Sequence, residues 1–558
     1  MDIPAGYQRL AGSERRPAPN ARLLGPADPT ERLSVTIVLR RRPDGPPVPD
    51  VNSFARPPLN RRMSSDEFAA QYGASPDDIA KIIAFARAHG LTIVETHAAR
   101  RTVVVSGTVT QMRNAFAVDL NRYEVPLPLD ARQRCRPVGP PQSYRGRDGF
   151  IHVPAELADL IVGIFGLDNR NITKRNAVGD PPNTTTLTVP TITKLYNFPS
   201  NSAAGQTIAI FSEDGYQKAD IQKYYATLPA GYMMPTIIDI SVDANNSGNP
   251  DPETTQDICI ASTVAQGAQI AVYFTTYDQK GWVDLIQRVA HPSAGDSTCS
   301  VLSSSFYVSN GDDLATLKAE GISTSWLTAV TAAFQDAAMQ GVTVCIASGD
   351  TGSDSKVGDG KAHVQYPASD PWVLSVGGTT VGNVQGSSFD EYVWNDVSIY
   401  GSFATGGGIS DFFNLPAYQN SAGVPQSVNG SRVGRGVPDV AANASPNSGY
   451  PMSAGSLNFA ASGTSASAPL YAGLIALLNA ALPRSVGFLN PTLYMLGNSV
   501  CQNISSPPGP ANNGLNGVTG YPAGAGWNAC TGWGRIDGNA LLLGLMIDIE
   551  SLALMAAQ

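Results

Sequence analysis

The chain contains the run Ser462-Gly463-Thr464-Ser465-Ala466-Ser467-Ala468-Pro469, which leads directly into Leu470-Tyr471-Ala472-Gly473-Leu474-Ile475-Ala476-Leu477-Leu478. This pattern predicts a turn of small residues at the start of a buried helix. Backbone N–H groups are free at a helix start, and the helix dipole favours negative charge there. Ser465 therefore stands where a nucleophile could attack a carbonyl and stabilise the resulting oxyanion. A serine or threonine that caps the helix is the alternative.

A serine nucleophile needs a base, and the usual base is a histidine. The chain has five histidines, at positions 89, 97, 152, 291 and 363. The first three lie in an N-terminal segment that we expect to be removable. Neither His291 nor His363 is followed by the glycine-containing turn and helix that would present such a base. We therefore predict that a carboxylate is the base for Ser465.

Two acidic residues follow a proline in the segment Asp251-Pro252-Glu253-Thr254-Thr255-Gln256-Asp257. A proline in the first turn and acids at that end predict a helix start. Glu253 and Asp257 are four residues apart and therefore share one face of the helix. Like charges on one face repel unless they share a proton, and sharing raises one pKa, as a general base working in acid requires. Two solvated acids on an exposed helix are the alternative.

A third acid follows an apolar segment, Val342-Thr343-Val344-Cys345-Ile346-Ala347, which is typical of a buried strand. The turn Gly349-Asp350-Thr351-Gly352 comes next. The carboxyl end of such a strand is the usual place for catalytic side chains in α/β folds, so Asp350 is a candidate site residue. An ordinary turn aspartate is the alternative.

The candidate residues occur along the chain in the order Glu253 and Asp257, then Asp350, then Ser465. In this order the chain resembles the sedolisin family, the serine-carboxyl peptidases, and most closely the kumamolisin type. The resemblance runs over nearly the whole chain. It includes Gly377-Gly378-Thr379, Trp394-Asn395, Gly406-Gly407-Gly408, Pro416-Ala417-Tyr418-Gln419, Gly434-Arg435-Gly436-Val437-Pro438-Asp439-Val440-Ala441 and Cys530-Thr531-Gly532.

The resemblance implies an α/β fold: a subtilisin-like catalytic domain with a parallel sheet, preceded by a smaller, ferredoxin-like α/β prodomain. It also implies that Glu253 is the general base for Ser465, that Asp257 supports Glu253, and that Asp350 donates to the oxyanion. A carboxyl group donates a hydrogen bond only while it is protonated. We therefore expect an acid-acting endopeptidase precursor that activates itself at low pH. A tripeptidyl-peptidase and a catalytically inactive binding homologue are the alternatives.

A chain of 558 residues is long for one domain and has the length expected of two domains. We expect a propeptide over 1–166, a cleavable linker over 167–188 and a catalytic domain over 189–558. In the propeptide, residues 1–30 are expected to be loosely ordered, 33–39, 92–94 and 102–105 to be strands, and 64–72, 77–89 and 109–116 to be helices. The resemblance implies that the propeptide assists folding and inhibits the enzyme within the same chain.

Charge is unevenly distributed along the chain. Residues 1–175 carry 25 basic and 18 acidic residues, a net charge of +7, whereas residues 176–558 carry 12 and 28, a net charge of −16. Opposite charges attract near neutral pH, and protonation of carboxylates in acid weakens that attraction. We infer a propeptide that is held by charge and released in acid. Two independently solvated charged surfaces are the alternative.

The sequence departs from the family at several positions. The resemblance implies a calcium site built from two aspartates and backbone carbonyls, but the matching residues are Asn503, Ile504, Gly524, Gly526 and Asn528. Affinity for calcium depends on ligand charge, so we expect one weakly bound calcium ion or none. Gln365 stands where kumamolisins have an aspartate in the pocket for the P2 residue, so a preference for basic P2 residues should be weakened. Phe306 replaces a supporting tryptophan, and Ser212 or Glu213 matches a glutamate of the catalytic relay.

The six cysteines are too few for a disulfide scaffold. Cys501 and Cys530 are candidates for one disulfide, whereas Cys259 and Cys345 are expected to be buried thiols. The N-terminus has no apolar stretch of the kind found in secretory signals, and the last apolar run, residues 540–547, is too short to span a bilayer. By resemblance alone we expect an extracellular monomer that acts on proteins or peptides, without nucleic-acid or membrane partners.

Overall fold

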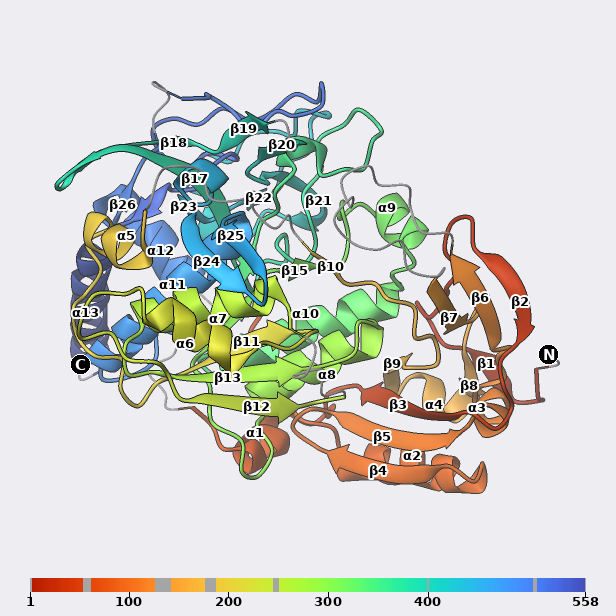
Figure 1. Cartoon of the computed structure of the whole chain (residues 1–558). Coiled ribbons are helices and arrows are strands. Elements are labelled where there is room, and N and C mark those ends of the chain that lie inside the picture. The colour runs from red at the N-terminus through yellow and green to blue at the C-terminus, as the bar shows by residue number, and fades with distance from the viewer. Residues whose placement is uncertain are drawn as a thin grey trace.

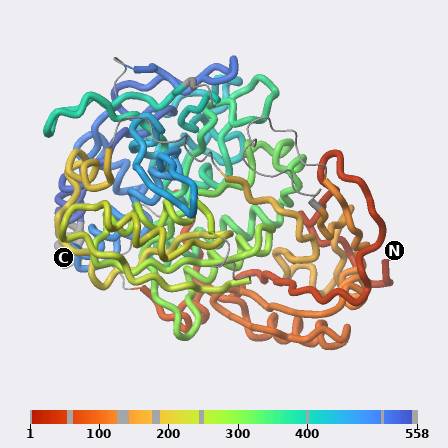
Figure 2. Tube along the Cα trace, viewed as in Figure 1, coloured from red at the N-terminus to blue at the C-terminus, as the bar shows by residue number. Residues whose placement is uncertain are grey.

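The computed structural model describes residues 3–53, 62–125, 142–175, 187–243, 250–398, 401–504 and 509–556. Two α/β parts lie side by side (Figure 1). The N-terminal part, red to orange, is the smaller, and the chain then passes into a larger part that contains the C-terminus (Figure 2).

The N-terminal part contains a four-stranded antiparallel sheet with the order β4-β5-β3-β9. Its strands are β3 (Arg32–Leu39), β4 (Thr92–His97), β5 (Thr102–Thr108) and β9 (Ile161–Phe165), and its helices are α1 (Ser65–Tyr72), α2 (Pro76–Ala88) and α3 (Val109–Phe116). The elements β3, α2, β4, β5, α3 and β9, with this strand order, form the predicted ferredoxin-like arrangement, with α1 inserted before α2 and further elements inserted between α3 and β9. Capping boxes at Ser64 and Thr108 begin α1 and α3.

The expectation of loose order over residues 1–30 is wrong for the described residues 3–30. Strand β1 (Tyr7–Arg9) pairs with β8 (His152–Pro154), and β2 (Arg22–Pro26) pairs with β6 (Asn121–Val125), which in turn pairs with β7 (Gln142–Gly146). A short helix, α4 (Ala155–Ala158), follows β8. The proline- and arginine-rich composition hid this order because the partner strands lie more than 90 residues away in the sequence.

The larger part is built on a sheet with the order β12-β13-β11-β14-β16-β17-β18, and β23 also pairs with β17. All of its pairings are parallel except the one between β17 and β18. The strands are β11 (Thr207–Ser212), β12 (Ile237–Ser241), β13 (Gln269–Phe274), β14 (Val301–Ser304), β16 (Thr343–Ala347), β17 (Leu374–Gln385), β18 (Ser388–Val393) and β23 (Val440–Asn443). The predicted parallel sheet is confirmed.

Helices cover both faces of this sheet, as burial of parallel strands requires. One apolar core contains residues of α6 (Lys218–Tyr225), α7 (Pro252–Val264) and α11 (Thr464–Ala481), and a second contains residues of α8 (Gln279–Ala290) and α10 (Thr324–Met339). The remaining helices are α5 (Val189–Leu195), α9 (Leu314–Ala319), α12 (Asn490–Leu496) and α13 (Gly538–Ala556). No helix in the described part of the chain is both long and apolar enough to cross a bilayer.

Short two-stranded sheets complete the larger part, and in one of them a strand from the end of the N-terminal part pairs with it. They are β10 (Lys174–Arg175) with β15 (Phe306–Tyr307), β19 (Asn395–Ser398) with β20 (Gly401–Ala404), β21 (Gly408–Asn414) with β22 (Gly434–Val437), β24 (Tyr450–Ala454) with β25 (Leu457–Ala461), and β26 (Cys501–Gln502) with β27 (Arg535–Ile536). Residues 176–186, in the centre of the expected linker, lie outside the described residues.

The N-terminal part contacts α8 and α10 through arginines. Arg41 and Arg101 each donate to one oxygen of Asp336 on α10, at 2.6 and 2.8 Å, and the Asp336 side chain is fully buried. The pKa of Asp336 is lowered to about 2 because the charges of Arg41 and Arg101 outweigh the effect of burial. This ion pair therefore persists in moderately acidic solution.

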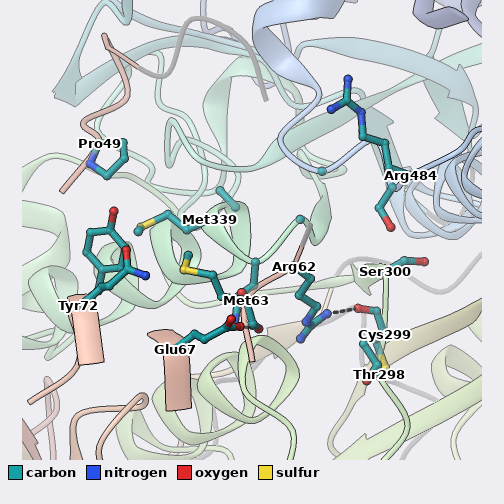
Figure 3. Close-up of a pocket in the computed structure, with 16 residues that line it drawn as sticks. Pro49, Arg62, Met63, Glu67, Tyr72, Thr298, Cys299, Ser300, Met339 and Arg484 are labelled. Atoms are coloured by element: carbon teal, nitrogen blue, oxygen red, sulfur yellow. Dashed lines mark hydrogen bonds between the residues drawn. The ribbon is translucent and has the colours of Figure 1, made fainter. Parts of the chain in front are cut away.

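Two further arginines cover the C-terminal end of α8. Arg62 donates to the carbonyls of Val289, Ala290 and Cys299, and Figure 3 shows its bond to Cys299 at the wall of a cavity of about 610 Å³. Arg100 donates to the carbonyl of His291, the residue that ends α8. Cations are favourable at this end of a helix, where carbonyl groups have no partner within the helix.

Two histidines meet at the same interface. The rings of His97, from β4, and His291 lie 6.4 Å apart between centroids. Burial lowers the pKa of His291 to about 3; Asp336 opposes this shift, whereas His97, Arg62 and Arg100 add to it. Burial and the nearby guanidinium groups of Arg100 and Arg288 lower the pKa of His97 to about 4. The docked arrangement therefore favours both imidazoles in their neutral form.

Candidate active site

Ser465 is the second residue of α11 and is fully buried. The helix begins after Gly463, which occupies the N-cap position without a side-chain cap and has a φ of +79°. The predicted helix start is confirmed, and the alternative that Ser465 is a capping residue is wrong. Its hydroxyl has no hydrogen bond of ordinary geometry to any described residue, although it lies close enough to Glu253 to affect the pKa of that carboxyl group.

Glu253 and Asp257 lie in the first two turns of α7, which packs against α11. Asp251 caps α7 and accepts a hydrogen bond from the Glu253 N–H at 3.0 Å. The exposed fractions of Glu253 and Asp257 are 2% and 0%, so the alternative of two solvated acids is wrong.

Burial and mutual repulsion perturb this carboxyl pair. The pKa of Glu253 is raised first by burial and then by the charge of Asp251, whereas Ser465 and Arg175 act in the opposite direction. The pKa of Asp257 is raised by burial and by the charge of Glu253. Two interacting acids of this kind titrate as a pair and retain one proton over a wide pH range.

Asp350 follows β16 at the carboxyl end of the parallel sheet and is also buried. Its Oδ1 accepts from the Thr464 N–H and from the Thr464 hydroxyl, both at 2.8 Å. The Gly349 N–H in turn donates to the Thr464 hydroxyl at 3.0 Å. The turn after β16 is thereby joined to the start of α11, one residue before Ser465. All four predicted site residues come together in the structure.

Two residues that the sequence patterns did not single out complete this arrangement. Ser305, directly after β14, donates from its hydroxyl to Asp257 at 2.9 Å, and the same hydroxyl lies 3.2 Å from the main-chain carbonyl of Ser465. Gln256 contacts the Glu253 carboxyl group through its amide nitrogen at 3.5 Å and accepts from the Ser462 N–H at 3.1 Å. Gln256 stands directly before Asp257 in the sequence, but nothing in its spacing indicates these contacts.

The five histidines lie elsewhere. His89, His97 and His152 belong to the N-terminal part, and His291 faces it. His363 contacts Asp359 and Asp313. The expectation that Ser465 has no histidine base agrees with these positions.

The residues expected to support the relay are buried beside the site. Burial raises the pKa of Glu213 to about 8, against the effects of Thr173 and Arg175. Ser212 exchanges a hydrogen bond with the Thr254 hydroxyl on α7 at 2.7 Å. Phe306 packs on Phe211, with ring centroids 5.7 Å apart.

The end of the N-terminal part reaches this site as strand β10. Lys174 and Arg175 pair antiparallel with Tyr307 and Phe306 of β15, the segment directly after Ser305. Arg175 forms ion pairs with Asp214 and with Asp251, the N-cap of α7, the latter at 2.5 Å. The chain thus lies along the strand that borders the carboxyl pair.

The expected disulfide between Cys501 and Cys530 is wrong, because both are free, buried thiols. Cys259 and Cys345 are buried thiols as predicted. Burial raises the pKa of each of these four thiols. Cys135 lies outside the described residues.

Comparisons with known proteins agree with this fold. The model of the pro-kumamolisin activation domain matches residues 19–170, and that of the subtilase family matches residues 240–497. Kumamolisin from Bacillus sp. (strain MN-32) is 38% identical over 96% of each chain, and tripeptidyl-peptidase sed5 from Aspergillus fumigatus is 33% identical over 96% of each chain. Pseudomonas sedolisin, a serine-carboxyl proteinase solved with pseudo-iodotyrostatin, superposes with a TM-score of 0.54 and 27% identity over 65% of this chain and 98% of that chain.

Fold and comparisons together define a peptidase with a subtilase-like domain behind an N-terminal activation domain. The chain belongs to the sedolisin family, and it is the precursor of a serine-carboxyl peptidase.

Gly463 provides a test of how the site is assembled. A Cβ atom at this position would lie 2.5 Å from Oδ2 of Asp350, whereas a Cβ at Gly455, which also has a positive φ of +57°, would meet nothing within 4 Å. Gly455→Ala should lose about 1–2 kcal/mol of stability from the left-handed backbone, and Gly463→Ala should lose more, because its φ of +79° with a ψ of 170° is a conformation that essentially only glycine adopts. Only Gly463→Ala should also lower kcat, on the order of 100-fold, because it displaces Asp350 from Thr464 and Ser465. Equal kcat values for the two variants would contradict the assembly described here.

Proposed function

We propose that the mature enzyme is an acid-acting endopeptidase that cleaves peptide bonds through an acyl-enzyme on Ser465. The observation that carries this proposal is that Ser465, Glu253 and Asp257 are buried where α7 packs on α11, and that Asp350 binds the start of α11, while the five histidines of the chain lie elsewhere. In this scheme Ser465 is the nucleophile, Glu253 the general base, Asp257 the proton-sharing partner of Glu253, and Asp350 the oxyanion donor.

The reaction follows from these positions. The Ser465 oxygen attacks the scissile carbonyl while Glu253 accepts the hydroxyl proton, and Asp257 supports the ionised form of Glu253 by holding the proton that the pair shares. The carbonyl oxygen becomes an oxyanion, which the protonated Asp350 and the N–H groups at the start of α11 stabilise. Glu253 then donates its proton to the leaving amine. Water repeats the sequence on the acyl-enzyme and releases the acid product.

This scheme predicts an acidic optimum. Asp350 must keep its proton to donate to the oxyanion, so kcat/KM for a peptide substrate should fall as the pH approaches neutrality. At the acid side, activity should fall once the Glu253–Asp257 pair takes up its second proton and can no longer accept one. A profile of kcat/KM that still rises near pH 7 excludes the mechanism.

Self-processing separates the active enzyme from the inactive binding homologue. Acidified wild-type precursor should lose its N-terminal part, seen as a mass change over time with a new N-terminus, whereas Ser465→Ala precursor should stay full length. Ser467→Ala provides a matched control, because Ser467 lies two residues further along the same helix and donates to main-chain carbonyls. Processing that survives in the Ser465→Ala precursor would favour an outside protease.

A tripeptidyl-peptidase is the second candidate, because relatives of this chain carry that name. The two activities differ in their need for a free substrate N-terminus. We expect the processed enzyme to cut an N-terminally acetylated peptide as readily as the free peptide, with products measured by mass spectrometry. Loss of cleavage on acetylation, with removal of three residues at a time from the free peptide, would favour the exopeptidase.

The N-terminal part is proposed to inhibit the precursor until acid releases it. Two features support this: β10 lies along β15 beside the site, and four arginines hold α8 and α10. Asp336 is a poor acid sensor because its pKa lies at about 2, so protonation of carboxylates does not account for release at this contact. His97 and His291 titrate in the relevant range.

Docking favours the neutral form of both histidines. A free imidazole has a pKa of about 6.5, and docking lowers the pKa of His291 to about 3 and of His97 to about 4. Docking is therefore fully favourable above pH 6.5 and weakens as the pH falls through the range below it. The precursor His97→Gln/His291→Gln should thus process with a midpoint at lower pH than wild type. His89→Gln, which alters a histidine bonded to Tyr7 and Phe85 within the N-terminal part, is the control. An unchanged midpoint in the double variant would exclude these histidines as sensors.

We further propose that the enzyme acts outside the cell as a monomer on protein or peptide substrates. The family resemblance supports the location. The absence of a membrane-spanning helix from the described residues is compatible with it. Assay of the culture medium of the source organism and sedimentation of the processed enzyme test the two statements.

A further inference from the structure

The predicted metal-site residues lie in two neighbouring loops near the C-terminus. Asn503 and Ile504 follow β26, and residues 524–528 precede β27, its antiparallel partner. Main-chain bonds in both directions between Asn528 and Gly532 close the second loop. Sequence resemblance implies calcium at this place, so the fit of these residues to a calcium ion can be judged from their hydrogen bonds.

The amide of Asn503 has a defined orientation. Its Oδ1 accepts from the Gly526 N–H at 3.0 Å, which places the amide nitrogen on the other side. Nδ2 then donates to the Gly526 carbonyl at 3.1 Å and to Oδ1 of Asn498 at 3.0 Å, and it approaches the Trp533 carbonyl at 3.4 Å. A flipped amide would set its nitrogen against the Gly526 N–H and its oxygen against carbonyls.

Asn528 is oriented in the same way. Its Oδ1 accepts from the N–H groups of Cys530 and Thr531, at 3.2 and 2.8 Å, and from the Thr531 hydroxyl at 3.1 Å. Its Nδ2 faces the carbonyls of Gly524 and Gly526 at 3.3 and 3.5 Å. Both amide nitrogens therefore converge on the Gly526 carbonyl.

These contacts do not fit a calcium ion. Calcium binds six to eight oxygens, and carboxylates supply much of its affinity. Here both asparagine oxygens point to N–H donors, and the carbonyls of Gly524 and Gly526 face amide hydrogens instead of a cation. Among the described residues, no group of three or more histidine, cysteine or acidic side chains forms a metal-binding cluster.

We propose that the side-chain amides of Asn503 and Asn528 replace a calcium ion in this chain. An ion would draw the carbonyls of the two loops together through its charge, and the amide N–H groups draw the same carbonyls together as hydrogen-bond donors. Amides do not titrate in acid, whereas aspartates lose their charge there and release a metal. The C-terminal loops are therefore held without metal throughout the acid range in which the peptidase works.

The test uses full-length Ser465→Ala protein, so that self-digestion does not affect the result and the outcome is independent of the proposed reaction. The melting temperature is measured at pH 6.5 with excess EGTA and with 1 mM calcium chloride, and bound calcium is measured by atomic emission after dialysis. With the two asparagines intact, we expect the same melting temperature in both solutions and no bound calcium. One tightly held calcium per chain after dialysis against chelator, or a lower melting temperature in EGTA, overturns the proposal.

The variant Asn503→Asp/Asn528→Asp restores two carboxylates to the loops. In EGTA this variant should melt at a lower temperature than the protein with both asparagines, because two negative charges then face carbonyl oxygens. Calcium should raise the melting temperature of the variant by several degrees, on the order of 2–4 °C for each kcal/mol of stability gained. The control Asn420→Asp/Asn458→Asp adds the same charge at two exposed positions and should show no calcium dependence. If the loop variant also lacks calcium dependence, the two amides are not what excludes the ion, and the proposal fails.

Discussion

The site depends on two carboxyl groups one helical turn apart that are buried against the helix carrying Ser465. An ionised carboxylate is expensive to bury, and two adjacent ones cannot both be ionised at moderate pH. The protein meets this constraint with raised pKa values for both carboxyl groups and with hydrogen bonds from Ser305 and Gln256. Ser305 also contacts the Ser465 carbonyl, and Gln256 also contacts the Ser462 N–H, so both residues reach the start of α11. One hydrogen-bond network therefore sets the position of the proton and the position of the nucleophile.

The N-terminal domain is connected to this network by charge. Arg175 pairs with Asp251, the residue that caps α7 directly before Glu253, and its positive charge acts to lower the pKa of Glu253. Removal of β10 would take this cation away from the carboxyl cluster. Processing that removes Arg175 would therefore change the electrostatics of the site.

Much of the fold and of the site could be predicted from sequence, because the signals are local. Each of these signals describes one element and its end. They are the four-residue spacing of Glu253 and Asp257, the strand and turn that lead to Asp350, and the run of small residues around Ser465. The contacts of Ser305, Gln256 and Arg175 join segments far apart in the chain, and no local pattern records them. The same reason explains the order found in residues 3–30, whose strands pair with distant partners. The disulfide expected between Cys501 and Cys530 rested on their nearness in sequence alone, which says nothing about the direction of their side chains.

The arginine contacts at the end of α8 have a consequence for the life of the protein after processing. Arg62 and Arg100 supply donors to four carbonyls at and beyond the last turn of that helix, and both residues lie in the segment that is cut away. Once that segment has diffused off, water alone hydrates those groups, and a chain that unfolds must rebuild the helix end without its former partner. In an enzyme that has lost this segment, the persistence of the α8 end would therefore rest on a slow rate of unfolding more than on the capacity to fold again.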